Sequence, residues 1–268
     1  MSRRTTRAIF GAAAAGAIIA TLGLTAAGPA DAATWPAPVA HGNNGPTHVA
    51  YANNSAGYDH YAGYDTASSN NWLFRYVATT VPVKACRIAP DKNPDAEVQL
   101  WSGTRWLAVI AVFCNGGAGS VDFFDQKSAT THRQGAFRLS PRIGDRLRIS
   151  VSRNVPGHQD SFTATNLRTG VSQTVVVTTS TAVVYHHAFV GSAVEHNADV
   201  MPLPATRRLL WTFQNSRVVT YGGVRGTLTG PWATVKEIDR TPGGVTVMFP
   251  SNLSPSGGGL STFLHAAA

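Results

Sequence analysis

The chain contains few charged residues, few cysteines and no long apolar run beyond its first 30 residues. Charged residues make up 13% of the 268 residues, against 43% hydrophobic ones. A disordered chain would have few apolar residues and many like charges, and a coiled coil would be rich in Glu, Lys and Leu, so both classes are excluded. The formal net charge is +8, but the arginines are spread along the chain rather than clustered. We therefore expect no nucleic-acid partner.

The N-terminus has the three parts of a secretory signal peptide. Three arginines lie within residues 3–7, residues 9–27 are apolar or small, and residues 30–32 read Ala-Asp-Ala, a small-residue cleavage site. A membrane anchor is the weaker alternative, because a cleavage site follows the apolar segment directly. We expect residues 1–32 to be removed and the mature protein to be secreted into the extracellular space. No later run approaches the ~20 apolar residues of a membrane span, so no membrane contact is expected after cleavage.

The mature chain would carry two cysteines, Cys86 and Cys114. In an exported protein this pair favours a disulfide, with a free thiol or a metal role as the alternative. The bridge would close a loop of about 30 residues and contribute about 3–4 kcal/mol in the chain-entropy model.

Short strands dominate the chain after a leader at residues 33–54, which has Pro, Gly and Asn without any period and is expected to be flexible. One domain is expected over 55–268. Within it, residues 146–152 alternate strictly between polar and apolar, as in a half-buried antiparallel strand. The run 107–113 is apolar throughout and predicts a strand covered on both faces. Further strands are predicted at 162–167, 172–178, 182–185, 209–213, 232–238 and 245–249.

Turn signals that contain glycine separate these segments, and no segment keeps the 3.6-residue period of an amphipathic helix. The predicted fold class is therefore all-β: an antiparallel β-sandwich of two sheets.

A series of local patterns follows one order along the chain. It runs from an aromatic-Ala-Gly-Tyr segment through Thr-Val-Pro with a cysteine, Ser-Pro with Gly-Asp, and an Asn-Leu turn to Val-Glu-His. In this sequence these are Tyr61–Tyr64, Thr79–Pro82 with Cys86, Ser140–Pro141 with Gly144–Asp145, Asn166–Gly170, and Val194–His196. Together with closing strands at 233–238 and 245–249, this order over about 58–265 resembles the eqolisins, a family of secreted glutamic peptidases. Cys114 is similar in position to the partner cysteine of bacterial members.

The resemblance implies a concanavalin-like sandwich with a concave substrate groove, and hydrolysis of peptide bonds at acid pH. In the family a Glu carboxylate activates a water and then protonates the leaving amine, while a Gln amide binds the oxyanion. The resemblance places the catalytic Glu at Glu195, although a frame shift of one residue would place Val194 there. The alternative reading of Glu195 is an exposed carboxylate without a catalytic role.

The catalytic Gln of the family has no counterpart at the matching position. Counting back from Cys114, that position falls on Leu107 or Ala108, and the run 107–113 contains no amide. Losing one oxyanion donor typically costs ~3–4 kcal/mol in the barrier. A hairpin through residues 102–105 would set Gln99 opposite Ala108, so Gln99 is a candidate substitute amide. The alternative is that Gln99 is a polar filler in a groove that has changed its use.

Other groove positions follow from the same resemblance. Strand alternation places Glu97, Gln99 and Trp101 on one face, which would line the groove. The remaining groove positions carried over from the family are Phe123, Asp125 and His196. An acidic cluster of Glu97, Asp125 and Glu195 would raise one carboxyl pKa, and such a pair of carboxylates could equally serve glycoside hydrolysis, which is the enzymatic alternative.

His186, His187 and His196 suggest a metal site, but no Cys or carboxylate stands at a familiar ligand spacing. We predict neither a metal nor another cofactor. Two functions of different class remain open: an acid-acting glutamic endopeptidase with a polypeptide substrate, and a catalytically inactive relative whose groove binds peptide or carbohydrate. In either case we expect a monomer.

Overall fold

The computed structural model describes residues 47–51, 60–66, 72–84, 95–103, 105–112, 120–127, 132–179, 183–194, 207–240 and 246–264. Every regular element within these ranges is a β-strand, so no described helix is long and apolar enough to cross a membrane. The predicted signal peptide, both cysteines, Glu195 and His196 lie outside the described residues. Secretion, the disulfide and the roles of those two residues therefore stay predictions.

Sixteen strands are described. In chain order they are β1 (Thr47–Tyr51), β2 (His60–Asp65), β3 (Phe74–Pro82), β4 (Asp95–Ser102), β5 (Arg105–Val112), β6 (Ser120–Gln126), β7 (His132–Ala136), β8 (Arg146–Asn154), β9 (Gln159–Asn166), β10 (Ser172–Thr178), β11 (His187–Val194), β12 (Arg208–Thr220), β13 (Arg225–Gly226), β14 (Val235–Arg240), β15 (Thr246–Pro250) and β16 (Leu260–Leu264).

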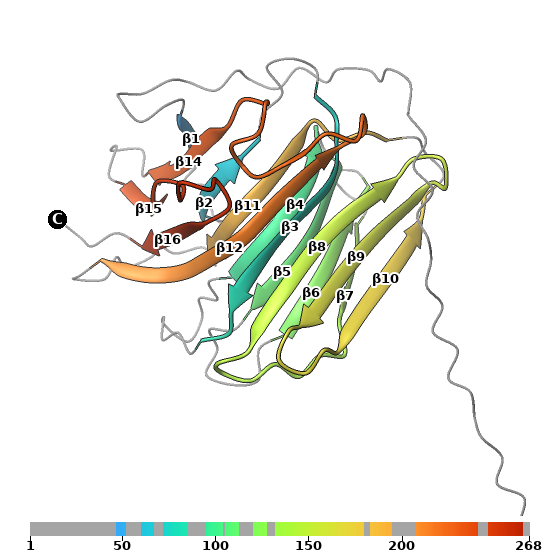
Figure 1. Cartoon of the computed structure of the whole chain (residues 1–268), viewed down its shortest axis with the longest axis horizontal. Coiled ribbons are helices and arrows are strands. Elements are labelled where there is room, and N and C mark those ends of the chain that lie inside the picture. The colour runs from blue at the N-terminus through green and yellow to red at the C-terminus, as the bar shows by residue number, and fades with distance from the viewer. Residues whose placement is uncertain are drawn as a thin grey trace, which may run out of the picture.

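The strands form two layers that share β12. The first sheet has the order β10-β9-β8-β3-β12, with β13 on β12, and the second has the order β12-β16-β15-β14-β2-β11-β4-β5-β6-β7. All neighbours are antiparallel except β1, which pairs in parallel with β14. In Figure 1 the strands β8, β9 and β10 of the first sheet lie in front of β5, β6 and β7 of the second. The predicted two-sheet antiparallel β-sandwich is therefore confirmed.

An irregularity in β12 allows this strand to pair within both sheets. Its first part pairs with β16, and the pairing with β3 begins at Gln214 and shifts register before Arg217. Asn215, inside this irregularity, has φ of 55°, a left-handed conformation that Asn tolerates better than most residues. Such bulges bend a strand and increase its twist, and β12 curves from one layer to the other in Figure 1.

The core lies between the two layers. Side chains alternate along each strand, and in β8 the residues Leu147, Ile149 and Val151 are fully buried while their neighbours face outward. They face the second sheet, where β4 contributes Val98 and Leu100. At about 25 cal/mol per Å² of apolar surface, burial of this kind is the main term that holds the layers together.

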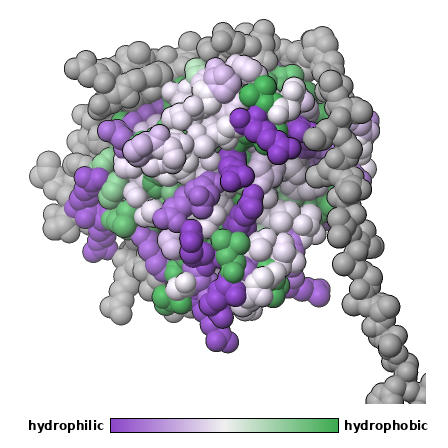
Figure 2. Space-filling model, viewed as in Figure 1, coloured by the Kyte–Doolittle hydropathy of each residue, from purple (hydrophilic) through white to green (hydrophobic). Residues whose placement is uncertain are grey.

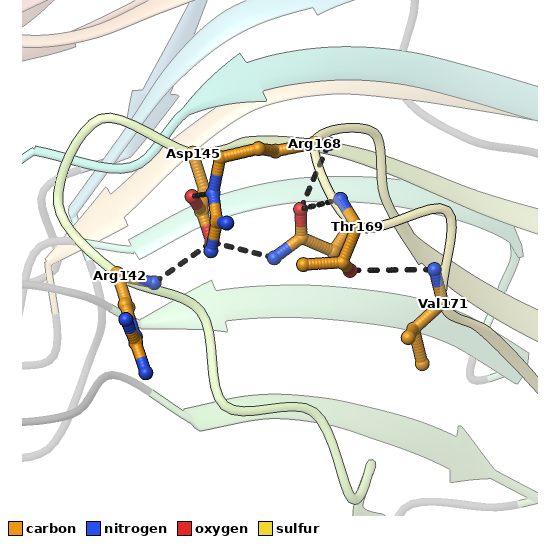
Figure 3. Close-up of polar contacts among 6 residues, drawn as sticks. Arg142, Asp145, Arg168, Thr169 and Val171 are labelled. Atoms are coloured by element: carbon orange, nitrogen blue, oxygen red, sulfur yellow. Dashed lines mark hydrogen bonds and ion pairs between the residues drawn. The ribbon is translucent and has the colours of Figure 1, made fainter.

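Hydrogen bonds to the Asp145 carboxylate join two loops at one end of the first sheet. Asp145 accepts hydrogen bonds from the Arg142 backbone N–H (3.0 Å), from Asn166 Nδ2 (2.5 Å) and from the Arg168 guanidinium. These contacts, drawn in Figure 3, hold the pKa of the Asp145 carboxyl well below its usual range, with the Arg168 hydrogen bond as the largest cause. Asp145 of the Ser-Pro…Gly-Asp segment and Asn166 of the Asn-Leu turn therefore hold these two loops together.

Several strand predictions are confirmed and others need correction. Residues 146–152 and 172–178 are strands β8 and β10. The predicted strand at 182–185 is wrong over its described part, because Tyr185 makes only an isolated bridge to Phe74. The strand predicted at 232–238 begins only at Val235. The leader expected to be flexible contains β1, while its other residues lie outside the described ranges.

Candidate functional site

The outer face of the second sheet, turned away from the first sheet, carries three carboxylates. Register places Glu237 of β14 opposite Gly63 of β2, Gly63 opposite Gly191 of β11, and Gly191 opposite Glu97 of β4. Directly opposed residues point to the same side of a sheet, so these four form one row across four strands. Asp65 lies on the same face, two residues along β2 from Gly63. We call Asp65, Glu97 and Glu237 the carboxylate cluster.

The two glycines are a steric requirement of this row. A Cβ atom on Gly191 would lie 2.3 Å from Phe189 Cζ and 2.4 Å from the Ala62 carbonyl oxygen. A Cβ atom on Gly63 would lie 2.6 Å from Phe189 Cε2. The Phe189 ring therefore covers both glycines, in the space between Glu97 and Glu237, and it is 2% exposed. This ring places apolar matter rather than water between the two glutamates.

Within the carboxylate cluster, the surroundings of Glu237 favour its protonated form. The pKa of the Glu237 carboxyl is raised well above its usual value, first by desolvation and then by the negative charges of Asp65 and Glu97. Asp65 and Glu97 are 4% and 1% exposed, whereas Glu237 is only half-buried. A carboxyl with a raised pKa in such surroundings can hold a proton at mildly acid pH and exchange it with a reacting group.

A histidine and a tryptophan hold one member of the cluster in place. His187 Nδ1 lies 2.7 Å from Asp65 Oδ2, and both residues are buried. The imidazole stacks on Trp101 with ring centroids 3.7 Å apart and an angle of 13° between the planes. Asp65 is thereby fixed in position beside Glu237.

Gln99 lies where the sequence pattern placed it. Its register partner on β5 is Ala108, as predicted, and its partner on β11 is Phe189. Glu97, Gln99 and Trp101 share the face of the carboxylate cluster, also as predicted, and Gln99 is 7% exposed. The Gln99 amide therefore lies on the cluster's face, two residues along the strand from Glu97. Its role as an oxyanion donor stays a prediction.

Phe123 and Asp125 lie on the opposite face of the second sheet from Glu97, which corrects their placement in the groove. Both point inward, since alternation along β6 puts Asp122, Phe124 and Gln126 on the outer face instead. Phe123 packs against Phe162 of the first sheet, with ring centroids 5.2 Å apart.

Asp125 belongs to a buried set of charges between the sheets. It is 0% exposed, lies 4.0 Å from Arg105, and its pKa is raised chiefly by desolvation. It therefore cannot join Glu97 in the expected acidic cluster. The glycosidase alternative loses this carboxylate, whereas Glu195, the third expected member, lies outside the described residues.

The end of β11 bears on the alternatives for the catalytic Glu. The last residue of β11 is Val194, and Glu195 follows outside the described residues. Val194 is fully buried in the core, on the face opposite Gly191. The one-residue shift that matches Val194 to the family's catalytic Glu would therefore put an apolar core residue at the catalytic position.

Sequence reasoning missed Asp65 and Glu237 as site residues. Both lie in segments that were quoted only for the family resemblance, one after the Ala-Gly-Tyr pattern and one in the closing strands. The signal available was the alternation Gly63-x-Asp65 and Phe189-x-Gly191, which predicts a strand face with small and acidic residues in the same row.

Histidines in the described part of the chain do not form a metal site. No group of three or more His, Cys, Asp or Glu residues there could hold an ion. His187 is engaged by Asp65 and Trp101.

No family model matches the chain, and no curated protein matches it. Among solved structures, it is similar to scytalido-glutamic peptidase bound to a transition-state analog inhibitor (13% identity, TM-score 0.55) and to the same peptidase bound to a peptide-based analog (16%, 0.55). It is also similar to SCP-B, a member of the eqolisin family in complex with the tripeptide Ala-Ile-His (14%, 0.52). Each alignment covers 78% of this chain and 100% of the peptidase chain. The chain thus has the β-sandwich fold of these glutamic peptidases.

Proposed function

We propose that the protein is a secreted hydrolase that cleaves peptide bonds at acid pH, with a carboxyl group as general base and Gln99 as the amide that binds the oxyanion. The observation that carries the proposal is the carboxylate cluster, where Glu237 has a raised pKa on the same sheet face as Gln99. The fold shared with glutamic peptidases supports it.

Two carboxyls compete for the role of general base. The family resemblance favours Glu195, whereas the geometry of the described residues favours Glu237, the half-buried member of the cluster. In either case the carboxylate must be ionised to take a proton from a water molecule as the water oxygen bonds to the carbonyl carbon. The carbonyl π electrons move to the oxygen, where the Gln99 N–H donates a hydrogen bond. The carboxyl then returns its proton to the amine nitrogen as the oxyanion electrons re-form the C=O bond and the C–N bond breaks, which leaves a carboxylic acid and an amine. With Glu237 as the base, its raised pKa would therefore move activity towards the less acid part of the pH range.

Aromatic side chains on the same sheet face would hold an extended substrate. Trp106 and Phe124 are in contact, with ring centroids 4.6 Å apart, and Trp101 lies in the same register row as Trp106. All three are half-buried. Such rings present flat apolar surface at the edge of a polar site.

A second function is favoured by one specific observation. Ala108 occupies the strand position opposite Gln99, and its fully buried side chain adds no donor. A protein with this face would bind a peptide or a carbohydrate on Trp101, Trp106 and Phe124 without cleaving it.

The deciding experiment is digestion of a reduced, alkylated protein by the purified mature chain from about pH 2.5 to about pH 7. We expect cleavage at acid pH that Glu237→Gln or Glu195→Gln abolishes, and the variant that loses activity identifies the base. Gln99→Ala should lower kcat by about 10²–10³-fold with little change in KM. The matched control is Asp122→Asn, which removes a half-buried carboxylate of β6 on the same sheet face and should leave activity intact.

Absence of cleavage by the folded wild type at every pH would contradict the peptidase proposal. Binding of peptide or oligosaccharide that Trp101→Ala weakens would then establish the second function.

A further inference from the structure

A pocket of about 440 Å³ opens at the outer side of the first sheet, on the opposite side of the sandwich from the carboxylate cluster. Among the described residues, no Asp or Glu lines it, and five of the lining residues are arginines: Arg75, Arg148, Arg153, Arg217 and Arg225. Figure 2 shows this side of the molecule, and hydrophilic residues gather near the centre of that view. A concentration of like charge in a concave site attracts ligands of the opposite sign.

The sheet register brings these arginines together around Tyr76 of β3. Arg225 of β13 lies opposite Val219, which in turn lies opposite Tyr76. Arg217 lies two residues along β12 from Val219, opposite Ala78 of β3. Arg148 of β8 reaches Tyr76 itself, since its Nη2 donates to the tyrosine hydroxyl at 3.4 Å.

A β-bulge adds another arginine. The register between β3 and β12 shifts after the Tyr76–Val219 pair, so that Arg75 is the extra residue on β3. Bulges re-aim side chains and are frequent beside functional sites. Arg75 is held by a hydrogen bond from its Nε to the Thr220 carbonyl oxygen at 2.9 Å, and it lines the pocket beside Arg225.

Only one of the five arginines has its charge neutralised by a described carboxylate. Arg153 points into the core and pairs with Asp160 at 2.8 Å. Arg75, Arg148, Arg217 and Arg225 form no ion pair with any described residue, and Arg217 and Arg225 are exposed. Desolvation, and after it the nearby charge of Arg225, lowers the pKa of Arg75. A bound anion would offset the like charge that Arg75 and Arg225 place beside one another.

The chemistry of the surroundings indicates what kind of anion fits. Arg presents a planar fork that binds carboxylate in two parallel hydrogen bonds. Beyond the pocket, the outward side chains of β9 and β10 are uncharged, and hydroxyls pair across them, as in Thr163–Thr174 (2.9 Å) and Thr165–Ser172 (2.8 Å). A nucleic acid would require cations along a longer track to match successive phosphates. A ligand with carboxylates on a hydroxyl-rich chain matches both parts of the face.

We propose that this arginine pocket binds an acidic polysaccharide, with the carboxylate of a uronic-acid unit held by Arg217, Arg225, Arg75 and Arg148 around Tyr76, and neighbouring sugars lying over the hydroxyl-rich face of β9. This site is independent of the proposed peptidase function, because it lies on the other outer face of the sandwich.

Calorimetric titration of the full mature chain with oligogalacturonate, at fixed low salt, tests the proposal. Arg217→Gln and Arg225→Gln should each weaken binding about tenfold, and Arg217→Lys should recover only part of the loss because it keeps the charge without the fork. Both side chains are exposed, so these variants should fold, which thermal unfolding verifies. Arg138→Gln, an exposed arginine outside the pocket, should bind as the wild type does.

Three results would overturn the proposal: no binding by the wild type, equal binding of the methyl-esterified oligosaccharide, or tighter binding of a single-stranded oligonucleotide at the same salt. Glu237→Gln should leave binding of oligogalacturonate unchanged, so failure of the peptidase proposal and failure of this one are distinguishable.

Discussion

Glu97 and Glu237 lie at the two ends of one register row, separated only by the glycines Gly191 and Gly63. Neighbouring strands are about 4.8 Å apart, so about 14 Å separates the two backbones. The Phe189 ring fills the space above the glycines. The negative charge of Glu97 contributes to the raised pKa of Glu237.

The stability of the protein should fall as the pH rises above about 4.3, the ordinary pKa of a glutamate. Glu237 is protonated in both the folded and the unfolded chain below that pH, and its raised folded pKa makes ionisation costly above it. The free energy of unfolding should therefore decline with pH until the folded pKa is passed, by at most about 1.4 kcal/mol per pH unit for one proton. Urea unfolding of wild type and Glu237→Gln at a series of pH values measures this.

In Glu237→Gln the decline should be reduced, and the variant should be more stable than the wild type near neutral pH. Equal pH dependence in the two proteins would contradict the assignment of the raised pKa to Glu237.

Gly191→Ala should destabilise the fold by about 1–3 kcal/mol, the usual cost of overpacking. Its new Cβ would meet the Ala62 carbonyl oxygen at 2.4 Å, and a backbone atom cannot move aside as a flexible side chain can. The matched control is Gly222→Ala, whose Cβ would meet only Thr220 Oγ1 at 3.9 Å. Urea midpoints decide the outcome, and an unchanged midpoint for Gly191→Ala would show that the row tolerates a side chain.

Asp145→Asn should lower the melting temperature by several degrees and remove a pH-dependent part of stability. The depressed pKa of Asp145 means that its contribution is present above the unfolded pKa of about 3.9 and is lost as the pH falls towards the folded value. Melting curves should thus differ between wild type and variant at pH 5 and above, and should converge in strong acid. A constant difference at all pH values would mean that the carboxylate charge is not what holds the two loops.

Arg153→Met should be among the most damaging single changes, because it leaves the fully buried Asp160 without its cation. Breaking a buried pair from one side typically costs about 3–5 kcal/mol. The double variant Arg153→Met with Asp160→Leu should recover much of the loss. Chemical unfolding of both variants tests this, and a double variant no better than the single one would show that packing around Arg153, not the lone charge, is responsible.

Local sequence patterns were enough to predict the fold class and many of the strands. Strict alternation in 146–152 predicted β8, and alternation across the 102–105 hairpin predicted that Gln99 faces Ala108. These are local properties, since a strand's period of two and the geometry of a tight hairpin depend on a few adjacent residues.

Tertiary structure alone decided which residues share a surface. Alternation gives two faces without saying which one meets the other sheet. The sequence therefore predicts Asp125 on the outer face, although packing of Phe123 on Phe162 turns Asp125 inward. Asp65, Glu97 and Glu237 come from strands far apart in the chain, and only the order β14-β2-β11-β4 makes them neighbours. Likewise, arginines that the sequence spreads evenly converge in one pocket because β3, β8, β12 and β13 are adjacent. Long-range register is set by the closure of the sheets and by side-chain packing between them, which no local pattern encodes.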